Sequence, residues 1–258
     1  VPSTYCRQLF LDAGFDPERI AVVPNGVDPQ LFDAERSVAP FPLPTQKPFR
    51  FLFVGGALPR KGIDVLLAAY RRAFTRADET TLVLKLFGTR SFYQLDAAFV
   101  AALRAFVADP SAPELVVLDD DVTDEEMVRL YRSCDALAFP YRGEGFGLPM
   151  LEAMACGLPV IATAGGAADD FLDGDVAYRV PASRVPLQGE FRGEALAGEG
   201  WWLEANVDDL AATLRHVAAH PDEARAKGAR GAERAHAAWT WEHAAAIAAE
   251  RLRALTAG

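Results

Sequence analysis

Runs of consecutive apolar residues alternate, through the middle of the chain, with stretches whose apolar positions recur every three or four residues. The first pattern is typical of strands buried in a parallel sheet, and the second of amphipathic helices. The alternation predicts an α/β protein with a Rossmann-like, doubly wound parallel sheet and further helices toward the ends of the chain. Strands are predicted at residues 51–54, 82–87, 115–118, 136–139 and 160–163, and helices at 63–74, 95–106, 124–134 and 149–156.

Residues typical of helix ends mark the boundaries of two of these helices, each of which follows a strand of the predicted sheet. Thr123 and Glu126 form the pattern of a capping box, while Pro149 and Gly157 mark the start and the end of a short helix. In such sheets, ligands bind outside the carboxyl ends of the strands. We therefore expect the chemistry of the protein in the loops that follow the predicted strands.

The two ends of the chain follow other patterns. Residues 1–32 contain one helix-like segment and a strand-like run at 20–23, and four prolines within 34–48 indicate a linker. Residues 181–203 are irregular and rich in Gly and Glu, which predicts an insertion or a mobile loop. From Asn206 onward the pattern is helical. Because the chain does not begin with Met, we interpret it as a piece of a longer protein.

Composition narrows the classes of partner and of site. A net charge of −10 disfavours nucleic-acid binding, which requires Lys and Arg at many phosphates. No run of 18 apolar residues predicts a transmembrane helix. The three cysteines, Cys6, Cys134 and Cys156, include no Cys-x-x-Cys pair. They predict buried thiols in a reducing compartment, the cytoplasm, rather than a disulfide framework or a zinc site.

A glycine-rich segment follows the strand predicted at 51–54. Gly55 and Gly56 allow a ligand to approach the backbone closely, and Arg60 and Lys61 add two cations just before the next helix. Together these features suit a diphosphate, although the Gly-Lys-Ser/Thr of a P-loop is missing. An ordinary turn with two solvated cations is an equal alternative.

A second glycine-rich segment runs from Glu144 to Glu152. Gly145 and Gly147 leave backbone N–H groups open to phosphate oxygens. We expect the helix N-terminus to keep Glu152 ionised, so that its carboxylate can accept hydrogen bonds from two ribose hydroxyls. The alternative is that Glu152 only complements the helix dipole and that Glu144 is solvated.

A third glycine pair, Gly165 and Gly166, follows the last predicted strand, and three such loops at one edge support a binding site together. Other features are better explained by structure than by chemistry. Asp119–Asp121 precedes the capping box and is typical of an exposed acidic loop. His216 and His220 have a metal-ligand spacing without a third ligand, so no metal site is predicted. We expect the tryptophans to pack rather than to bind a ligand.

Taken in order, these segments resemble the retaining GT-B glycosyltransferases of family 4, also called glycosyl transferases group 1. Residues 144–163 are similar to the Glu-x7-Glu motif of that family and its continuation, and residues 61–64 are similar to its Lys-Gly-x-Asp. Residues 1–3 and 23–28 resemble the end of its N-terminal domain. The resemblance covers nearly the whole chain and is most specific at 144–163.

The resemblance implies a division of the chain. Residues 1–32 would be the remnant of an N-terminal acceptor domain, 33–48 a linker, 49–235 the nucleotide-sugar-binding domain and 236–258 a crossing helix. Most of the acceptor domain would then be absent, and a glycan or lipid-linked acceptor would bind there. We therefore expect this piece to bind donor nucleotide, to transfer little sugar alone and to self-associate through its exposed ends.

The resemblance also implies roles for residues. Lys61, helped by Arg60, would stabilise the diphosphate that leaves, Glu144 would contact the transferred sugar, and Glu152 would bind the ribose. No cofactor and no metal is implied, because the donor is a nucleoside-diphosphate sugar and Lys61 supplies the cation. The other positions assigned to nucleotide binding are Gly55, Gly56, Val122 at the base, Gly145, Phe146, Gly147, Leu148, Gly165 and Gly166.

Two departures and two alternatives accompany the resemblance. The family often has Arg at the position of Gly56, for which Arg60 would substitute, and often has Gly near Asp120.

One alternative function is another GT-B-like sugar-nucleotide enzyme, such as a 2-epimerase, and the other is a non-catalytic nucleotide-sugar-binding module. A cytoplasmic place, peripheral to the inner membrane in the full-length protein, and bacterial polysaccharide biosynthesis follow from family analogy alone.

Overall fold

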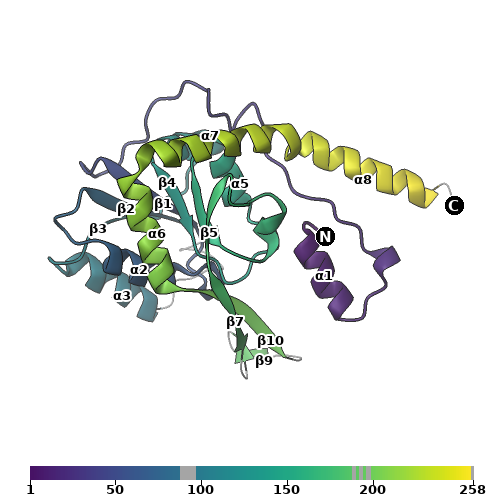
Figure 1. Ribbon diagram of the computed structural model, residues 1–258, viewed down its shortest axis with the longest axis horizontal. Helices are drawn as coiled ribbons and strands as arrows, with labels where there is room; N and C mark the ends of the chain where they lie inside the picture. The colour runs from purple at the N-terminus through teal and green to yellow at the C-terminus, as the bar shows by residue number, and fades with distance from the viewer. Residues whose placement is uncertain (88–96, 188–189, 192–193, 196–198, 257–258) are drawn as a thin grey trace.

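The structure is a computed structural model that describes residues 1–87, 97–187, 190–191, 194–195 and 199–256. The centre of this described part is a six-stranded sheet with the order β3-β2-β1-β4-β5-β6 (Figure 1). Every neighbouring pair in it is parallel, which confirms the predicted doubly wound sheet. The strands are β1 (Phe49–Gly55), β2 (Thr80–Leu86), β3 (Glu114–Leu118), β4 (Ala136–Phe139), β5 (Val160–Thr163) and β6 (Ala177–Val180).

Five of these strands were predicted, because each contains a run of apolar residues. The residues of β2, β4 and β5 are all buried, and these strands are apolar apart from Lys85 and the threonines at their ends. Strand β6 was missed because only its two end residues, Ala177 and Val180, are fully buried. It lies at the edge of the sheet, where a strand needs fewer apolar side chains.

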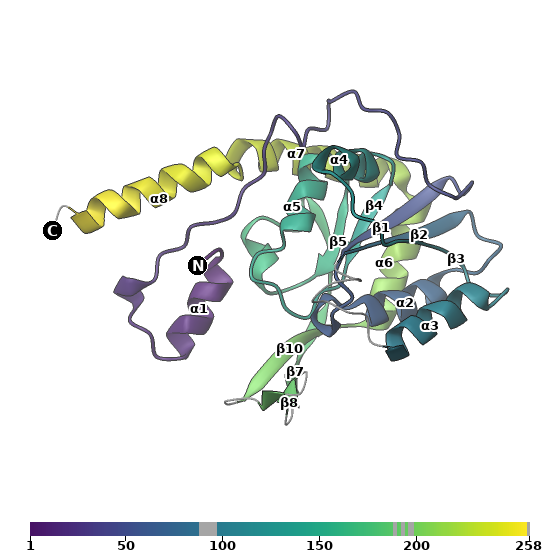
Figure 2. The ribbon, with the colours of Figure 1, turned by 180° about the vertical axis from the view of Figure 1, so that it is seen from behind.

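Helices cover both faces of the sheet. Right-handed crossovers place α2 and α3 on one face, and the reversal of strand order at β1 places α4 and α5 on the other (Figures 1 and 2). The helices are α2 (Ile63–Ala73), α3 (Ala97–Ala108), α4 (Asp124–Arg132), α5 (Leu148–Ala155) and α6 (Val207–Ala219), which packs on α2. The capping box of α4 is confirmed, since the Glu126 carboxylate accepts a hydrogen bond from the Thr123 N–H at 2.8 Å. The predicted residue Leu95 of α3 lies outside the described residues.

The described part of residues 181–203 is not irregular, as expected from the composition, but forms an antiparallel hairpin. Strand β7 (Ala182–Leu187) pairs along its whole length with β10 (Gly200–Ala205), and the short β8 (Glu190–Phe191) pairs with β9 (Glu194–Ala195). The β7–β10 hairpin projects from the body of the domain (Figure 1). Pro186 within β7 and the surrounding Gly and Glu residues hid the strand pattern.

The ends of the chain form two arms. The N-terminal arm contains α1 (Thr4–Asp12) and the single turn η1 (Pro17–Arg19), and the residues at 20–23 are extended without forming the expected strand. Residues 33–48 contain no helix or strand, as the linker prediction requires. Helix α7 (Pro221–Ala238) ends before the separate helix α8 (Trp241–Thr256), which extends beyond the body over the N-terminal arm in both views (Figures 1 and 2).

The two arms cross at one point. The Val27 N–H donates to the Trp239 carbonyl at 2.9 Å, and the Trp241 N–H donates to the Val27 carbonyl at 3.2 Å. A Cβ atom at Gly26 would lie 2.2 Å from the backbone of Thr240, so only glycine allows this close approach. The assignment of residues 1–32 to a second domain stays a prediction. None of the helices in the described part of the chain is long and apolar enough to cross a bilayer.

Candidate functional site

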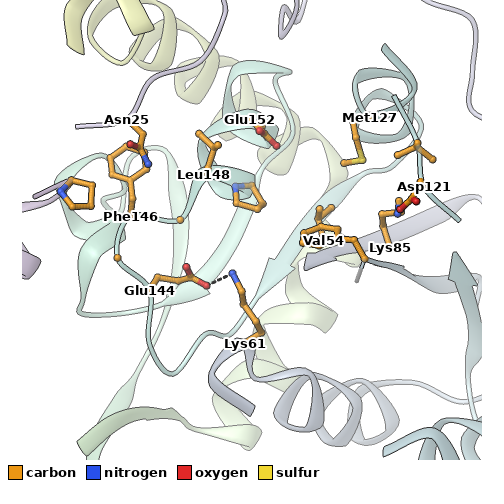
Figure 3. Close-up of a pocket in the computed structure, with 16 residues that line it drawn as sticks. Asn25, Val54, Lys61, Lys85, Asp121, Met127, Glu144, Phe146, Leu148 and Glu152 are labelled. Carbon is orange, nitrogen blue, oxygen red and sulfur yellow. Dashed lines mark ion pairs between the residues drawn. The ribbon is translucent and has the colours of Figure 1, made fainter. Parts of the chain in front are cut away.

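A cavity of about 610 Å³ lies at the carboxyl ends of β1, β2, β3 and β4, beside the point where the strand order reverses (Figure 3). This is the edge of the sheet where the sequence predicted a ligand. Eight of the predicted site residues line the cavity: Lys61, Val122, Glu144, Gly145, Phe146, Gly147, Leu148 and Glu152.

Lys61 and Glu144 meet at one end of the cavity. The Lys61 ammonium forms an ion pair with the Glu144 carboxylate (Figure 3). Arg60 Nη1 lies 3.0 Å from Glu144 Oε1. The Glu144 side chain is only 8% exposed, so the alternative of a solvated Glu144 is wrong. Gly62 adopts φ +71°, and a Cβ atom there would lie 1.9 Å from the Pro140 carbonyl oxygen. The glycine therefore lets the loop of Lys61 lie directly against the segment that leads to Glu144.

The charge of Lys61 depends on two opposing effects. Burial lowers the pKa of the Lys61 ammonium, whereas the nearby Glu144 carboxylate raises it. The ammonium also lies 5.2 Å from the centre of the Phe139 ring, a cation–π contact. A desolvated lysine held against a single carboxylate is a strong site for a competing anion, because in low dielectric the ammonium interacts strongly with any negative group that reaches it.

A buried arginine that the sequence reasoning missed holds the two loops together. Arg142 Nη1 and Nη2 each lie 2.7 Å from a carboxylate oxygen of Asp64, and Nη2 also donates to Glu204 at 2.7 Å. Its Nη1 donates to the Pro59 carbonyl at 2.8 Å. Asp64 of the Lys-Gly-x-Asp segment thus positions the loop of Lys61 through Arg142, and Glu204 attaches the β7–β10 hairpin to the same group.

The glycine segment before α5 forms the wall of the cavity. Gly147 is the N-cap of α5 with φ +98°, and a Cβ atom there would lie 2.2 Å from Met150 Cε. At the start of α5, Pro149 has no N–H and the Met150 N–H donates to the Gly147 carbonyl at 2.9 Å, so the Leu148 N–H is the helical donor that is offered to an anion. The Gly145 carbonyl accepts hydrogen bonds from Ser3 Oγ at 2.8 Å and from Cys6 Sγ at 3.3 Å. Cys6 is half-buried, whereas Cys134 and Cys156 are buried.

Glu152 differs from the expectation that the helix N-terminus keeps it ionised. It lies one turn into α5, and the Tyr131 hydroxyl donates to Glu152 Oε2 at 2.8 Å. Burial raises the pKa of Glu152 to about 7, against an ordinary value of 4.5. The loss of solvation therefore outweighs the favourable field of the helix, and the carboxyl is about half protonated near neutral pH.

The other end of the cavity is formed by residues that the sequence reasoning did not assign to a site, including Asp121 of the acidic run that it interpreted as an exposed loop. Lys85 on β2 and Asp121 after β3 line it together with the apolar side chains of Val54 and Met127 (Figure 3). Lys85 is 2% exposed, and its ammonium donates to the carbonyls of Leu86 and Asp120, both at 2.8 Å. A lysine inside an otherwise apolar predicted strand was the signal that could have identified it.

Comparison with known proteins identifies the family. The sequence profile described as Glycosyl transferases group 1 matches residues 48–187. The chain belongs to this family. It is 29% identical over 250 residues to the MMP alpha-(1->4)-mannosyltransferase of Mycolicibacterium hassiacum, covering 95% of this chain and 51% of the relative. It is 34% identical over 225 residues to the D-inositol 3-phosphate glycosyltransferase of Frankia alni, covering 78% and 54%. The chain thus spans about half the length of these relatives.

Solved structures of group 1 and other GT-B glycosyltransferases share the fold. Anabaena Alr3699/HepE in complex with UDP-glucose has a TM-score of 0.72 at 17% identity, with 100% of this chain and 63% of that chain covered. The C-terminal domain of the group 1 protein LpcC from Francisella tularensis has a TM-score of 0.61 at 19% identity, with 84% and 100% covered. The Rossmann-like fold predicted from the sequence is therefore confirmed.

Five predicted positions of this group 1 chain do not line the cavity: Gly55, Gly56, Arg60, Gly165 and Gly166. Gly165 and Gly166 instead pack against Leu203 of the hairpin, and the Tyr141 hydroxyl donates to the Gly165 carbonyl at 2.6 Å. A Cβ atom at Gly56 would have only ordinary contacts.

The features discounted at the sequence level have structural roles. The rings of His216 and His220 stack 4.2 Å apart, His216 lies 3.1 Å from Glu223, and no cluster of metal-binding side chains occurs among the described residues. Trp239 packs against Phe146 and Phe171 with ring centres 6.1 and 5.5 Å away.

Proposed function

We propose that this chain is the donor-binding part of a retaining glycosyltransferase and binds a nucleoside-diphosphate sugar without a metal ion. The observation that carries the proposal is a cavity at the reversal of strand order that is lined by Lys61 and the start of α5, with Arg60 paired from outside the lining to the Glu144 carboxylate. Two cations and a helix N-terminus form a site for a diphosphate, and they would stabilise the negative charge on the departing nucleotide.

The rest of the cavity accommodates the other parts of such a donor. Glu152, once ionised, would accept hydrogen bonds from the ribose hydroxyls, and the apolar surface of Val54, Val122 and Met127 suits the flat base. Glu144, released from Lys61 when the diphosphate arrives, would face the sugar. Arg60 already reaches Glu144, so it would serve where many family members have Arg at the position of Gly56.

The comparisons support this proposal at a coarser level. The curated relatives are named as glycosyltransferases, and one structural neighbour is in complex with UDP-glucose. Because the chain spans about half of these relatives, the acceptor, a glycan or a lipid-linked molecule, would bind mainly to the remainder of the protein. We expect this chain alone to bind donor nucleotide and to transfer little sugar, in the cytoplasm or at the inner face of the membrane.

Calorimetric titration of the chain with UDP, GDP and ADP tests the proposal. One of these nucleotides should bind, equally well with EDTA and with Mg²⁺, and the Lys61→Ala and Glu152→Ala variants should weaken that binding. Lys47→Ala is the matched control, because Lys47 pairs with Glu79 at the surface away from the cavity. If a folded chain binds none of the three, or if Lys47→Ala weakens binding as much as Lys61→Ala, the proposed site is wrong.

A further inference from the structure

Lys85 and Asp121 have no role in the proposed function, although both line the cavity. They belong to the side formed by β2 and β3, whereas Lys61 and Glu144 follow β1 and β4. Figure 3 shows the two side chains next to each other, beyond Val54 and below Met127. If the diphosphate lies at Lys61, the base of the nucleotide reaches this other end.

Lys85 presents a hydrogen-bond donor in a fixed position. Its side chain is 2% exposed, and the two carbonyls of Leu86 and Asp120 hold the ammonium at 2.8 Å each. An ammonium has three N–H donors and no acceptor, and the hydrogen bonds to described residues use two of them. A buried lysine restrained in this way favours a ligand atom that accepts a hydrogen bond and disfavours one that donates.

Asp121 presents the opposite chemistry beside it. It is the first of the acidic neighbours that favour the charged form of Lys85, and a carboxylate can only accept hydrogen bonds. The cavity therefore places one group that only donates next to one group that only accepts. The two groups come from different elements, β2 and the loop after β3, so the sheet itself fixes their juxtaposition.

The four common bases divide into two classes at such a pair. Uracil and guanine present a carbonyl oxygen next to a ring N–H, whereas cytosine and adenine present an amino group next to a bare ring nitrogen. We propose that Lys85 and Asp121 read the base of the donor and select a carbonyl beside a ring N–H, that is, uracil or guanine. With adenine or cytosine, donor would face donor and acceptor would face acceptor, so that the buried Lys85 ammonium and the Asp121 carboxylate would each oppose a like group of the base. This inference rests on the proposed function.

Titration of the chain with UDP, GDP, CDP and ADP tests the selection. At least one of UDP and GDP should bind about 10- to 100-fold more tightly than both CDP and ADP, and the comparison of the two distinguishes uracil from guanine. In Asp121→Asn the amide can donate to a bare ring nitrogen, so the preference should fall about tenfold while the affinity for the diphosphate end is kept. Asp119→Asn is the matched control, because it removes the same charge from the same exposed run outside the lining of the cavity.

The variant Lys85→Met tests the lysine. It should also reduce the preference for UDP or GDP over CDP and ADP about tenfold or more. If that variant does not fold, Asp121→Asn still decides, because Asp121 is exposed and its replacement disturbs no packing. A purely structural Lys85 would lower the melting temperature without changing the ratio of affinities, and that result would overturn the proposal. Equal binding of all four nucleotides would overturn the base selection alone, whereas no binding at all would overturn the proposed function with it.

Discussion

Glu144 and Glu152 line the same cavity, but their surroundings differ. The Glu144 carboxylate faces the cations of Lys61 and Arg60, whereas the Glu152 carboxyl faces the Tyr131 hydroxyl in the apolar interior. Glu144 lies on a loop, where its carboxylate forms ion pairs with Lys61 and Arg60. Glu152 is held by Tyr131 on a helix, and burial raises the pKa of its carboxyl to about 7. Residue type and spacing make the two glutamates look alike in the sequence.

The difference between them comes from elements that are distant along the chain. The partners of Glu144 belong to the loop after β1, and the partner of Glu152 belongs to α4. The regular spacing of the two glutamates predicts a shared cavity, but the charge of each depends on which side chains the fold brings to it. Four predictions test this contrast, beginning with the largest expected effect.

The stability of the protein should depend on pH through Glu152. The folded state raises the pKa from 4.5 to about 7, so between these values the folded chain binds more protons than the unfolded chain, and stability falls as pH rises. The loss is on the order of 3 kcal/mol at most and is complete above the folded-state pKa. Urea unfolding of wild type and Glu152→Gln between pH 5 and 8 measures it. The prediction is wrong if the two proteins show parallel pH profiles.

Removal of the Lys61 cation should weaken nucleotide binding about 100-fold. The substitution Lys61→Ala deletes charge-assisted hydrogen bonds to phosphate and leaves Glu144 with Arg60 alone to oppose its charge. Calorimetry with the nucleotide that binds wild type measures the effect. An affinity within threefold of wild type, with Lys47→Ala as the control, would show that the diphosphate lies elsewhere.

The affinity for nucleotide should rise about tenfold between pH 6 and pH 8, because the ionised fraction of Glu152 grows by that factor around its raised pKa. The Glu152→Gln variant should lose this part of the dependence, and it also corrects for protonation of the phosphate of the ligand. Binding isotherms at both pH values for both proteins give the comparison. Identical profiles would mean that Glu152 does not contact the ribose.

Removing the charge of Glu144 should strengthen nucleotide binding, and this is the smallest of the four expected effects. Glu144→Gln frees Lys61 from its internal partner, so we expect a bare nucleoside diphosphate to bind several-fold more tightly. The corresponding nucleotide sugar should gain less, because it loses a carboxylate at the sugar. Weaker binding of the bare diphosphate would show that Glu144 supports the phosphate site instead of competing for it.

The sequence predicted the scaffold well and the electrostatics poorly. Buried strands are visible as apolar runs, and the two glycine segments identified half of the residues that line the cavity. Arg142 was not foreseen, because its partners Asp64 and Glu204 lie far away along the chain and the second belongs to a hairpin hidden by its composition. Lys85 is visible as a lysine inside an apolar strand, but the strand pattern alone does not place it at the cavity, and the raised pKa of Glu152 requires knowledge of its burial.

The crossing of the two arms has a mechanical consequence for the cavity. Val27 is hydrogen-bonded to the residues on both sides of Thr240, where α7 gives way to α8, and Ser3 in the same N-terminal arm holds the Gly145 carbonyl. Arg251 of α8 also donates to the Glu18 carbonyl at 2.6 Å, so the arm is fastened to that helix again farther out. The N-terminal arm therefore contacts both α8 and the peptide that precedes the start of α5, so it links the C-terminal helix to the wall of the cavity.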